Sequence, residues 1–216
     1  MMAPPERGPE RDAAIQAMLP NVPFDGWSRR ALAIALAASG APADEADLLF
    51  PGGAVEMIEA FCDLADRRMT EGAVALDLTD KGLIARVREV IALRLAQNHP
   101  NKEAIRHAVS VLALPIHARQ ALGCTARTVG AIFRAAGDRS ADISWYTKRI
   151  MLAAVYSATL LYWLRDAGED DAATLAFLDR RLAGIGRTYA LRGRAEAALR
   201  RAMPRLRRPA RLPTQA

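Results

Sequence analysis

Apolar residues along this chain recur mainly at the three-to-four-residue spacing of helices that bury one face. The strict apolar–polar alternation that is typical of strands is rare. Alanine, leucine and arginine, which are all strong helix formers, dominate the sequence. We therefore predict an all-α fold of about ten helices.

Prolines and glycines divide the apolar segments into separate helices. Pro20 ends the first expected helix, and Gly40 ends the second, as glycines often do at helix C-termini. The segment 50–53 separates the third from the fourth, and His99-Pro100 and Pro115 interrupt the second half of the chain. The expected helices cover residues 10–19, 27–38, 42–49, 54–69, 80–97, 101–114, 115–136, 141–164, 171–182 and 187–203.

The N-terminal residues 1–12 are polar and contain prolines, with no apolar stretch of the kind that a secretory signal requires. The longest apolar run, residues 150–164, is shorter than the roughly 20 residues of a membrane-spanning helix. We interpret that run as a buried core helix.

Charge is distributed unevenly along the chain. The net charge is +6, but residues 180–216 contain eleven arginines and one acid, Glu196, so this segment carries +10 and the rest carries −4. A basic tail favours nucleic acid or an anionic lipid surface, and charge alone leaves both open.

Residues with catalytic or metal-binding chemistry form no recognisable motif. His99, His107 and His117 lack the spacing and the accompanying carboxylates of a metal site. Cys62 and Cys124 form no CxxC pair, which favours a reducing compartment. Without a nucleophile motif or a phosphate-binding loop, we predict that the protein is not an enzyme and has no cofactor and no metal site.

The N-terminal helices resemble the helix-turn-helix domain of TetR-type regulators. The resemblance lies in Ala31-Leu32, in Gly40 and in the segment 49–53 before the long fourth helix. It implies a DNA-binding head on a larger, usually dimeric, ligand-binding body. The expected recognition helix, residues 42–49, contradicts DNA binding because Asp44, Glu45 and Asp47 would face the phosphates and no cation would. We therefore expect a packing domain without nucleic-acid binding, and keep a TetR-family transcriptional regulator as the alternative.

The most specific stretch of the sequence is AGDRSADISWYTKR at residues 136–149. It resembles the Coq accessory proteins of ubiquinone biosynthesis, the ninth Coq protein family, in which an AGD-x-S-x-D-x-x-WYT motif precedes an apolar helix. Further matching segments lie at residues 22–27, 50–53, 93–95 and 177–181. The chain departs from the family pattern at residues 130–133, where Asp-Asp-Ile-Trp is usual, and at Ala104-Ile105, where Trp-Pro is frequent.

This resemblance implies a TetR-like fold, no DNA binding, a lipid-accommodating cavity and a homodimer. The implied partner is the di-iron hydroxylase that acts on demethoxyubiquinone. The implied partner-binding residues are Asp142, Trp145, Tyr146, Lys148 and Arg149. Exposed aromatic and cationic side chains of this kind often anchor interfaces, although Trp145 could instead be a core residue that caps its helix.

Two expected helices have more apolar surface than one packing face needs, so they could line a lipid cavity or a dimer interface. For any single one of these positions, ordinary core packing is the more common explanation. The candidate lipid-binding residues are Leu83, Val87, Val90, Ile91, Met151, Val155 and Leu160.

The arginine-rich final helix is typical of an amphipathic segment that lies on a membrane surface. The candidate membrane-contact residues are Leu191, Arg192, Arg194, Leu199, Arg200 and Arg201. A solvated basic tail or a nucleic-acid contact is the alternative.

Together these features predict an accessory protein that presents an isoprenoid quinone intermediate, or holds a phospholipid, beside the hydroxylase. Its expected location is cytoplasmic and peripheral to the inner membrane, or on the matrix side in a mitochondrion. The expected division is a disordered segment (1–9), a helix-turn-helix-like domain (10–53), a lipid-binding and dimerisation domain (54–184), a membrane helix (185–204) and a disordered tail (205–216).

Overall fold

The computed structural model describes residues 5–138, 144–168 and 170–184 of the chain. Within these ranges all regular structure is helical, which confirms the predicted all-α class. The elements are α1 (Pro9–Met18), α2 (Val22–Asp25), α3 (Arg29–Ala38), α4 (Glu45–Leu49), α5 (Gly53–Ala73), α6 (Leu83–Asn98), η1 (His99–Asn101), α7 (Lys102–Leu112), η2 (Pro115–His117), α8 (Ala118–Ala135) and α9 (Ser144–Arg165). Residues 172–184 are also helical.

Local sequence signals account for most helix boundaries. The Ser28 hydroxyl accepts a hydrogen bond from the Ala31 amide at 3.1 Å and so caps α3. Gly40, at φ +80°, follows the end of the same helix in a conformation that side chains disfavour. The prolines before α7 and α8 produce the short 3-10 turns η1 and η2 rather than simple breaks.

Four elements differ from those predicted, and one of them is α4, which begins at Glu45 rather than at residue 42. The short helix α2 was not expected. Helix α5 continues past residue 69 because Met69 and Ala73, one turn apart, are both buried. Helix α6 begins at Leu83 rather than at residue 80, since Gly82 is still extended. The expected helix 187–203 lies outside the described residues.

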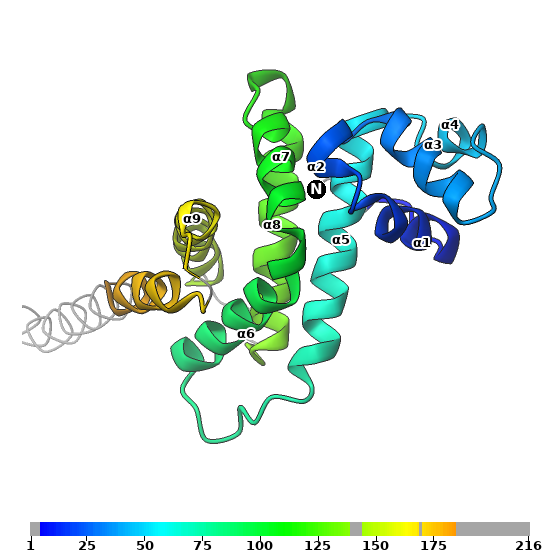
Figure 1. Ribbon diagram of the computed structural model, residues 1–216. Coiled ribbons are helices and arrows are strands. Elements are labelled where there is room, and N and C mark those ends of the chain that lie inside the picture. The colour runs from blue at the N-terminus through cyan, green and yellow to red at the C-terminus, as the bar shows by residue number, and fades with distance from the viewer. Residues whose placement is uncertain (1–4, 139–143, 169, 185–216) are drawn as a thin grey trace, which may run out of the picture.

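The helices are arranged around α5 and α8, which pack along one another more extensively than any other pair. Helices α1 to α4 gather on one side of α5, while α9 and the helix at 172–184 lie on the opposite side of the molecule (Figure 1). One hydrophobic core runs through both parts. Its largest fully buried side chains include Met18, Phe50, Met57, Ile132 and Trp163.

The N-terminal helices are fixed to the body by polar contacts as well as by this core. The Trp27 indole donates a hydrogen bond to the Ala104 carbonyl at 2.9 Å, across 77 residues of sequence. Asp63 on α5 accepts from Arg7 and from Arg67, with shortest distances of 2.6 and 3.0 Å. Helices α1 to α4 therefore hold a defined position against α5 and α7.

Candidate functional site

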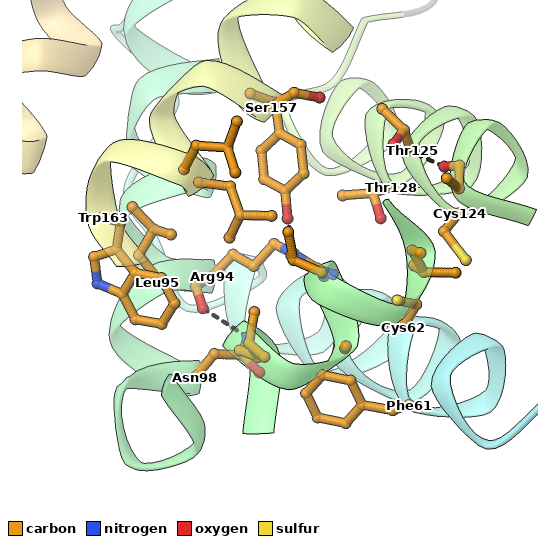
Figure 2. A pocket seen from close by; sticks show the side chains of 18 of the residues that line it. Phe61, Cys62, Arg94, Leu95, Asn98, Cys124, Thr125, Thr128, Ser157 and Trp163 are labelled. Atoms are coloured by element: carbon orange, nitrogen blue, oxygen red, sulfur yellow. Dashed lines mark hydrogen bonds between the residues drawn. The ribbon is translucent and has the colours of Figure 1, made fainter. Parts of the chain in front are cut away.

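A cavity of about 330 Å³ lies in the body, between α5, α6, α7, α8 and α9 (Figure 2). Its size falls at the lower end of the range of roughly 300–1,000 Å³ that is usual for small-molecule sites. Its walls are mainly apolar. The lining residues are Phe61, Cys62, Arg94, Leu95, Asn98, Ile105, Ala108, Val109, Leu112, Ala113, Ala121, Cys124, Thr125, Thr128, Tyr156, Ser157, Leu160, Leu161 and Trp163.

One charged side chain, Arg94, reaches into this apolar space from α6 (Figure 2). Its Nε donates a hydrogen bond to the Tyr156 hydroxyl at 2.9 Å, and its Nη1 lies 2.5 Å from Oδ1 of Asp66. Thr128 donates to the other carboxylate oxygen of Asp66 at 3.2 Å. The Arg94 carbonyl accepts from the Asn98 side chain at 2.7 Å. Arg94 is thus held directly by partners from two other helices, α5 and α9, and indirectly by α8 through Asp66.

Burial shifts the pKa values of Asp66, Tyr156 and Arg94 in this cluster. Burial raises the pKa of Asp66, and the Arg94 guanidinium opposes that rise only in part. The pKa of Tyr156 is also raised by burial, so its phenol keeps its proton at neutral pH. Burial alone would lower the pKa of Arg94, but the nearby Tyr156 and Asp66 reverse that effect and raise it. Arg94 is therefore a cation whose charge is balanced by Asp66.

The two cysteines of the chain, although distant in sequence, both line this cavity. The pKa of Cys62 is raised by its hydrogen bond to Cys124 and by burial. The pKa of Cys124 is lowered by that same bond and by Arg127, whose Nη2 lies 3.3 Å from its sulfur. Among the described residues, no group of three or more His, Cys, Asp or Glu side chains is arranged to hold a metal ion.

Of the candidate lipid-binding residues, one lines the cavity and the others lie in or beside the core. Leu160 lines the cavity, and Val155 is buried on the same helix, α9. Val87, Val90 and Ile91 are buried in the core on α6, but they lie outside the cavity wall. Leu83 and Met151 are half-buried and also lie outside it. Leu160 is thus the predicted residue that the geometry brings to the cavity.

The candidate partner-binding residues lie at the start of α9. Tyr146 is 70% exposed, as is Ile150 one turn later. Lys148 Nζ lies 3.9 Å from Asp138, and the Arg149 guanidinium stacks 5.3 Å from the centroid of the Phe133 ring. Trp145 belongs to α9 by its backbone, while Asp142 lies outside the described residues. Phe133, one of the departures from the family pattern, therefore supports Arg149.

The candidate membrane-contact residues lie outside the described residues. They are Leu191, Arg192, Arg194, Leu199, Arg200 and Arg201. Within the part of the chain that the structure describes, no helix has the length and apolar character needed to cross a bilayer.

Helix α4, in the position of a recognition helix, is acidic. It has Glu45 and Asp47 in its first turn and follows Asp44. A nearby cation, Arg29, forms an ion pair with Asp47 at 3.0 Å. The negative charge predicted for this helix from the sequence is therefore present in the folded structure.

Sequence reasoning did not single out Asp66, Arg94, Asn98 or Thr128 as members of a site. The available signal was Arg94 itself, a charged residue among the apolar positions of its helix, beside Ile91 and Leu95. Buried charges are normally paired, so such a residue indicates a partner elsewhere in the chain. The identity of that partner depends on how α5, α6 and α9 pack.

Comparison with known proteins supports the resemblance inferred from the motifs. The COQ9 family model matches residues 118–188. The mitochondrial ubiquinone biosynthesis protein COQ9 of Drosophila melanogaster is 32% identical over 196 residues, covering 81% of this chain and 58% of that protein. The human protein of the same name is 30% identical, covering 78% of this chain and 55% of its own length. The chain thus spans little more than half the length of these relatives.

The arrangement of helices also has a counterpart among solved structures. The crystal structure of a TetR transcriptional regulator from Nitrosomonas europaea matches with a TM-score of 0.65 and 25% sequence identity. The match covers 82% of this chain and 97% of that one, so the predicted TetR-like fold is confirmed. This chain is a relative of the COQ9 proteins, built on a TetR-like fold.

Proposed function

We propose that this protein is a non-catalytic, lipid-binding accessory protein of ubiquinone biosynthesis. In this proposal it presents a quinone intermediate to the di-iron demethoxyubiquinone hydroxylase at the membrane surface. The observation that carries the proposal is the mainly apolar cavity between α5 and α9. An apolar, partly enclosed space of this size favours the binding of a hydrophobic ligand. The names of the relatives, which are ubiquinone biosynthesis proteins, favour a quinone precursor as that ligand.

With a volume of about 330 Å³, the cavity would enclose only one end of a long polyprenyl ligand. The remainder would extend along the protein surface or into the bilayer. This arrangement suits a protein that presents its ligand rather than one that stores it. A basic segment after residue 184 would hold the open end near anionic lipid.

The hydroxylase would dock at the start of α9. Tyr146 and Ile150 are exposed there on neighbouring turns, beside the cations Lys148 and Arg149. Exposed aromatic and aliphatic side chains flanked by cations form the usual anchors of protein interfaces. The cavity and the docking surface thus share α9, which also contributes Tyr156 and Leu160 to the cavity wall.

Filling the cavity tests ligand binding. Ala121 and Ala126 both lie on α8, but Ala121 lines the cavity and Ala126 is exposed to solvent. The Ala121→Phe variant should lose co-purifying isoprenoid or phospholipid, measured by extraction and mass spectrometry. The matched Ala126→Phe variant should retain it. Equal lipid content in both variants, or no lipid in the unmodified protein, contradicts the proposal.

A separate experiment tests the pathway and the docking surface. Deleting the gene should cause the demethoxy intermediate to accumulate, and the Tyr146→Ala, Ile150→Ala double variant should fail to restore the quinone profile or to retain the hydroxylase in a pull-down. Phe24→Ala is the control, because Phe24 is 88% exposed on α2, away from α9. A normal quinone pool in the deletion strain would overturn the proposed function.

The competing function is transcriptional regulation, which the similarity to a TetR regulator favours. The acidic first turn of α4 opposes it, since a helix that enters a DNA groove is walled by phosphates. Salt-dependent binding to a specific duplex, abolished by changes in α4, would establish the regulator instead.

A further inference from the structure

In the polar group inside the cavity, the Tyr156 hydroxyl has a hydrogen-bond donor to spare. The Tyr156 hydroxyl oxygen accepts from Arg94 Nε at 2.9 Å. A phenol oxygen can accept one bond and donate another. Among the hydrogen bonds of the described residues, none is donated by the Tyr156 hydroxyl. The hydroxyl hydrogen of a buried tyrosine normally finds an acceptor, and both Tyr156 and Arg94 line the cavity.

The surroundings of Tyr156 hold this donor in place. Arg94 is itself fixed by Asp66 at 2.5 Å, and Asp66 is fixed by Thr128 at 3.2 Å. This chain of contacts links α5, α6, α8 and α9, so the hydroxyl cannot turn away without breaking a buried ion-paired network. The donor is therefore preorganised, which reduces the entropic cost of binding a ligand oxygen.

The same network determines what kind of ligand oxygen fits. Among the described residues that line the cavity, Arg94 is the one cation, and Asp66 already balances its charge. A phosphate or carboxylate would require an unpaired cation, because burying an uncompensated charge is strongly unfavourable. A neutral carbonyl, ether or phenol oxygen needs only the hydroxyl donor. The remaining wall, which includes Leu95, Ile105 and Leu160, suits a ring and its first isoprene unit.

We propose that Tyr156, positioned by Arg94, donates a hydrogen bond to a neutral ring oxygen of the ligand. The cavity thereby receives the oxygenated ring of a prenylated quinone or phenol and leaves the polyprenyl tail outside. This inference rests on the proposed function, because it names the end of the lipid that the cavity recognises. It assigns Arg94 as a positioning residue and Tyr156 as the residue that contacts the ligand.

Two probes with the same tail and different heads test this assignment. Geranylbenzoquinone carries ring oxygens, and geranylbenzene has the same tail and no oxygen. Dissociation constants are measured by titration calorimetry on the full-length, delipidated protein. The variants are Tyr156→Phe and, as a control, Tyr162→Phe on the same helix, where the ring stacks on Phe177 at 4.6 Å rather than lining the cavity.

The unmodified protein should bind the quinone about 5–10-fold more tightly than the hydrocarbon, the range that one neutral hydrogen bond provides. Tyr156→Phe should remove most of that preference while geranylbenzene affinity stays within about twofold, and Tyr162→Phe should leave both affinities unchanged. If Tyr156→Phe binds both probes with the original preference, the inference is overturned and the proposed function stands. If the unmodified protein binds neither probe, both this inference and the proposed function are overturned. Tighter binding of a phosphatidylglycerol than of the quinone would overturn the neutral-ring assignment.

Discussion

The buried pair formed by Arg94 and Asp66 allows a quantitative test of how this fold is held together. Arg94 is 6% exposed and Asp66 is 7% exposed, so water screens neither charge effectively. Replacing Arg94 with methionine keeps much of the side-chain volume and removes the cation. Breaking one partner of a buried ion pair typically costs about 3–5 kcal/mol, because the remaining charge is left uncompensated. For a domain of this size we expect the melting temperature to fall by about 6–20 °C.

Removing both partners should cost much less than removing one. In the Arg94→Met, Asp66→Leu double variant no buried charge remains, and such replacements are often close to neutral. The Thr128 hydroxyl loses its acceptor, but it can bond to the carbonyl four residues earlier, as Thr125 already does at 2.9 Å on the same helix. The double variant should therefore recover at least half of the stability that Arg94→Met loses.

The pH dependence of the single variant gives an independent check. The pKa of Asp66 is already raised by burial, and loss of Arg94 should raise it further. A folded pKa above the unfolded value of about 3.9 means that the folded state binds more protons, so stability falls as pH rises from that value. The deficit of Arg94→Met should thus be smallest below about pH 4 and larger at pH 7.

Urea denaturation followed by circular dichroism measures the stability loss of the single variant, that of the double variant, and the pH dependence of the single variant. The buried Trp27 and Trp163 supply a second, fluorescent probe, and coincident transitions would support two-state analysis. A loss below about 1 kcal/mol for Arg94→Met would refute the reasoning, as would a double variant whose loss equals the sum of the two single losses.

Three further predictions concern other contacts. Asp63→Asn should lower stability by about 2 kcal/mol at pH 7, because Arg7 and Arg67 lose a charged acceptor. Burial alone would raise the pKa of Asp63, but the two arginines lower it overall, so this contribution is present above about pH 4 and disappears as pH falls through the lowered pKa; a constant difference from pH 2 to 7 in urea titrations would contradict it. Trp27→Phe should cost about 1–2 kcal/mol in the same assay by removing the bond to the Ala104 carbonyl, and an unchanged midpoint would show that this bond is dispensable. In a Cys62→Ser variant, where Cys124 is the remaining cysteine of the chain, bound geranylbenzoquinone should slow its alkylation by iodoacetamide several-fold because Cys124 lines the cavity, whereas equal rates would place the ligand elsewhere.

The helices were largely predictable because their signals are local. A capping serine at position 28, a glycine at position 40 and prolines at 100 and 115 each act within one turn of their own backbone. The extension of α5 to Ala73 was less predictable, since Gly72 lowers helix propensity there. A Cβ at this position would lie 2.6 Å from Nε2 of the Gln97 side chain on α6, which would have to move from its hydrogen bond to the Arg68 carbonyl.

The cavity could not be located from the sequence in the same way. Helix α6 carries the apolar residues Val87, Val90 and Ile91 as well as the charged residue Arg94. Periodicity predicts that the three apolar residues are buried, but it does not predict which helices they pack against. Only the packing of α5, α8 and α9 shows that the core takes the apolar side of α6 while the cavity receives Arg94. The family resemblance implied that a cavity exists, but it did not identify its polar residues.

All residues described as lining the cavity come from Phe61 on α5 onward, and none comes from α1 to α4. Substitutions on the outer surface of the N-terminal helices can therefore accumulate without altering what the cavity binds. An ancestral scaffold of this shape could lose or acquire affinity for nucleic acid by exchanging a few exposed side chains on α3 and α4, while its ligand pocket evolved under separate selection. This separation of the exposed N-terminal surface from the cavity offers a structural reason why one fold can occur both in a transcriptional regulator and in relatives of ubiquinone biosynthesis proteins.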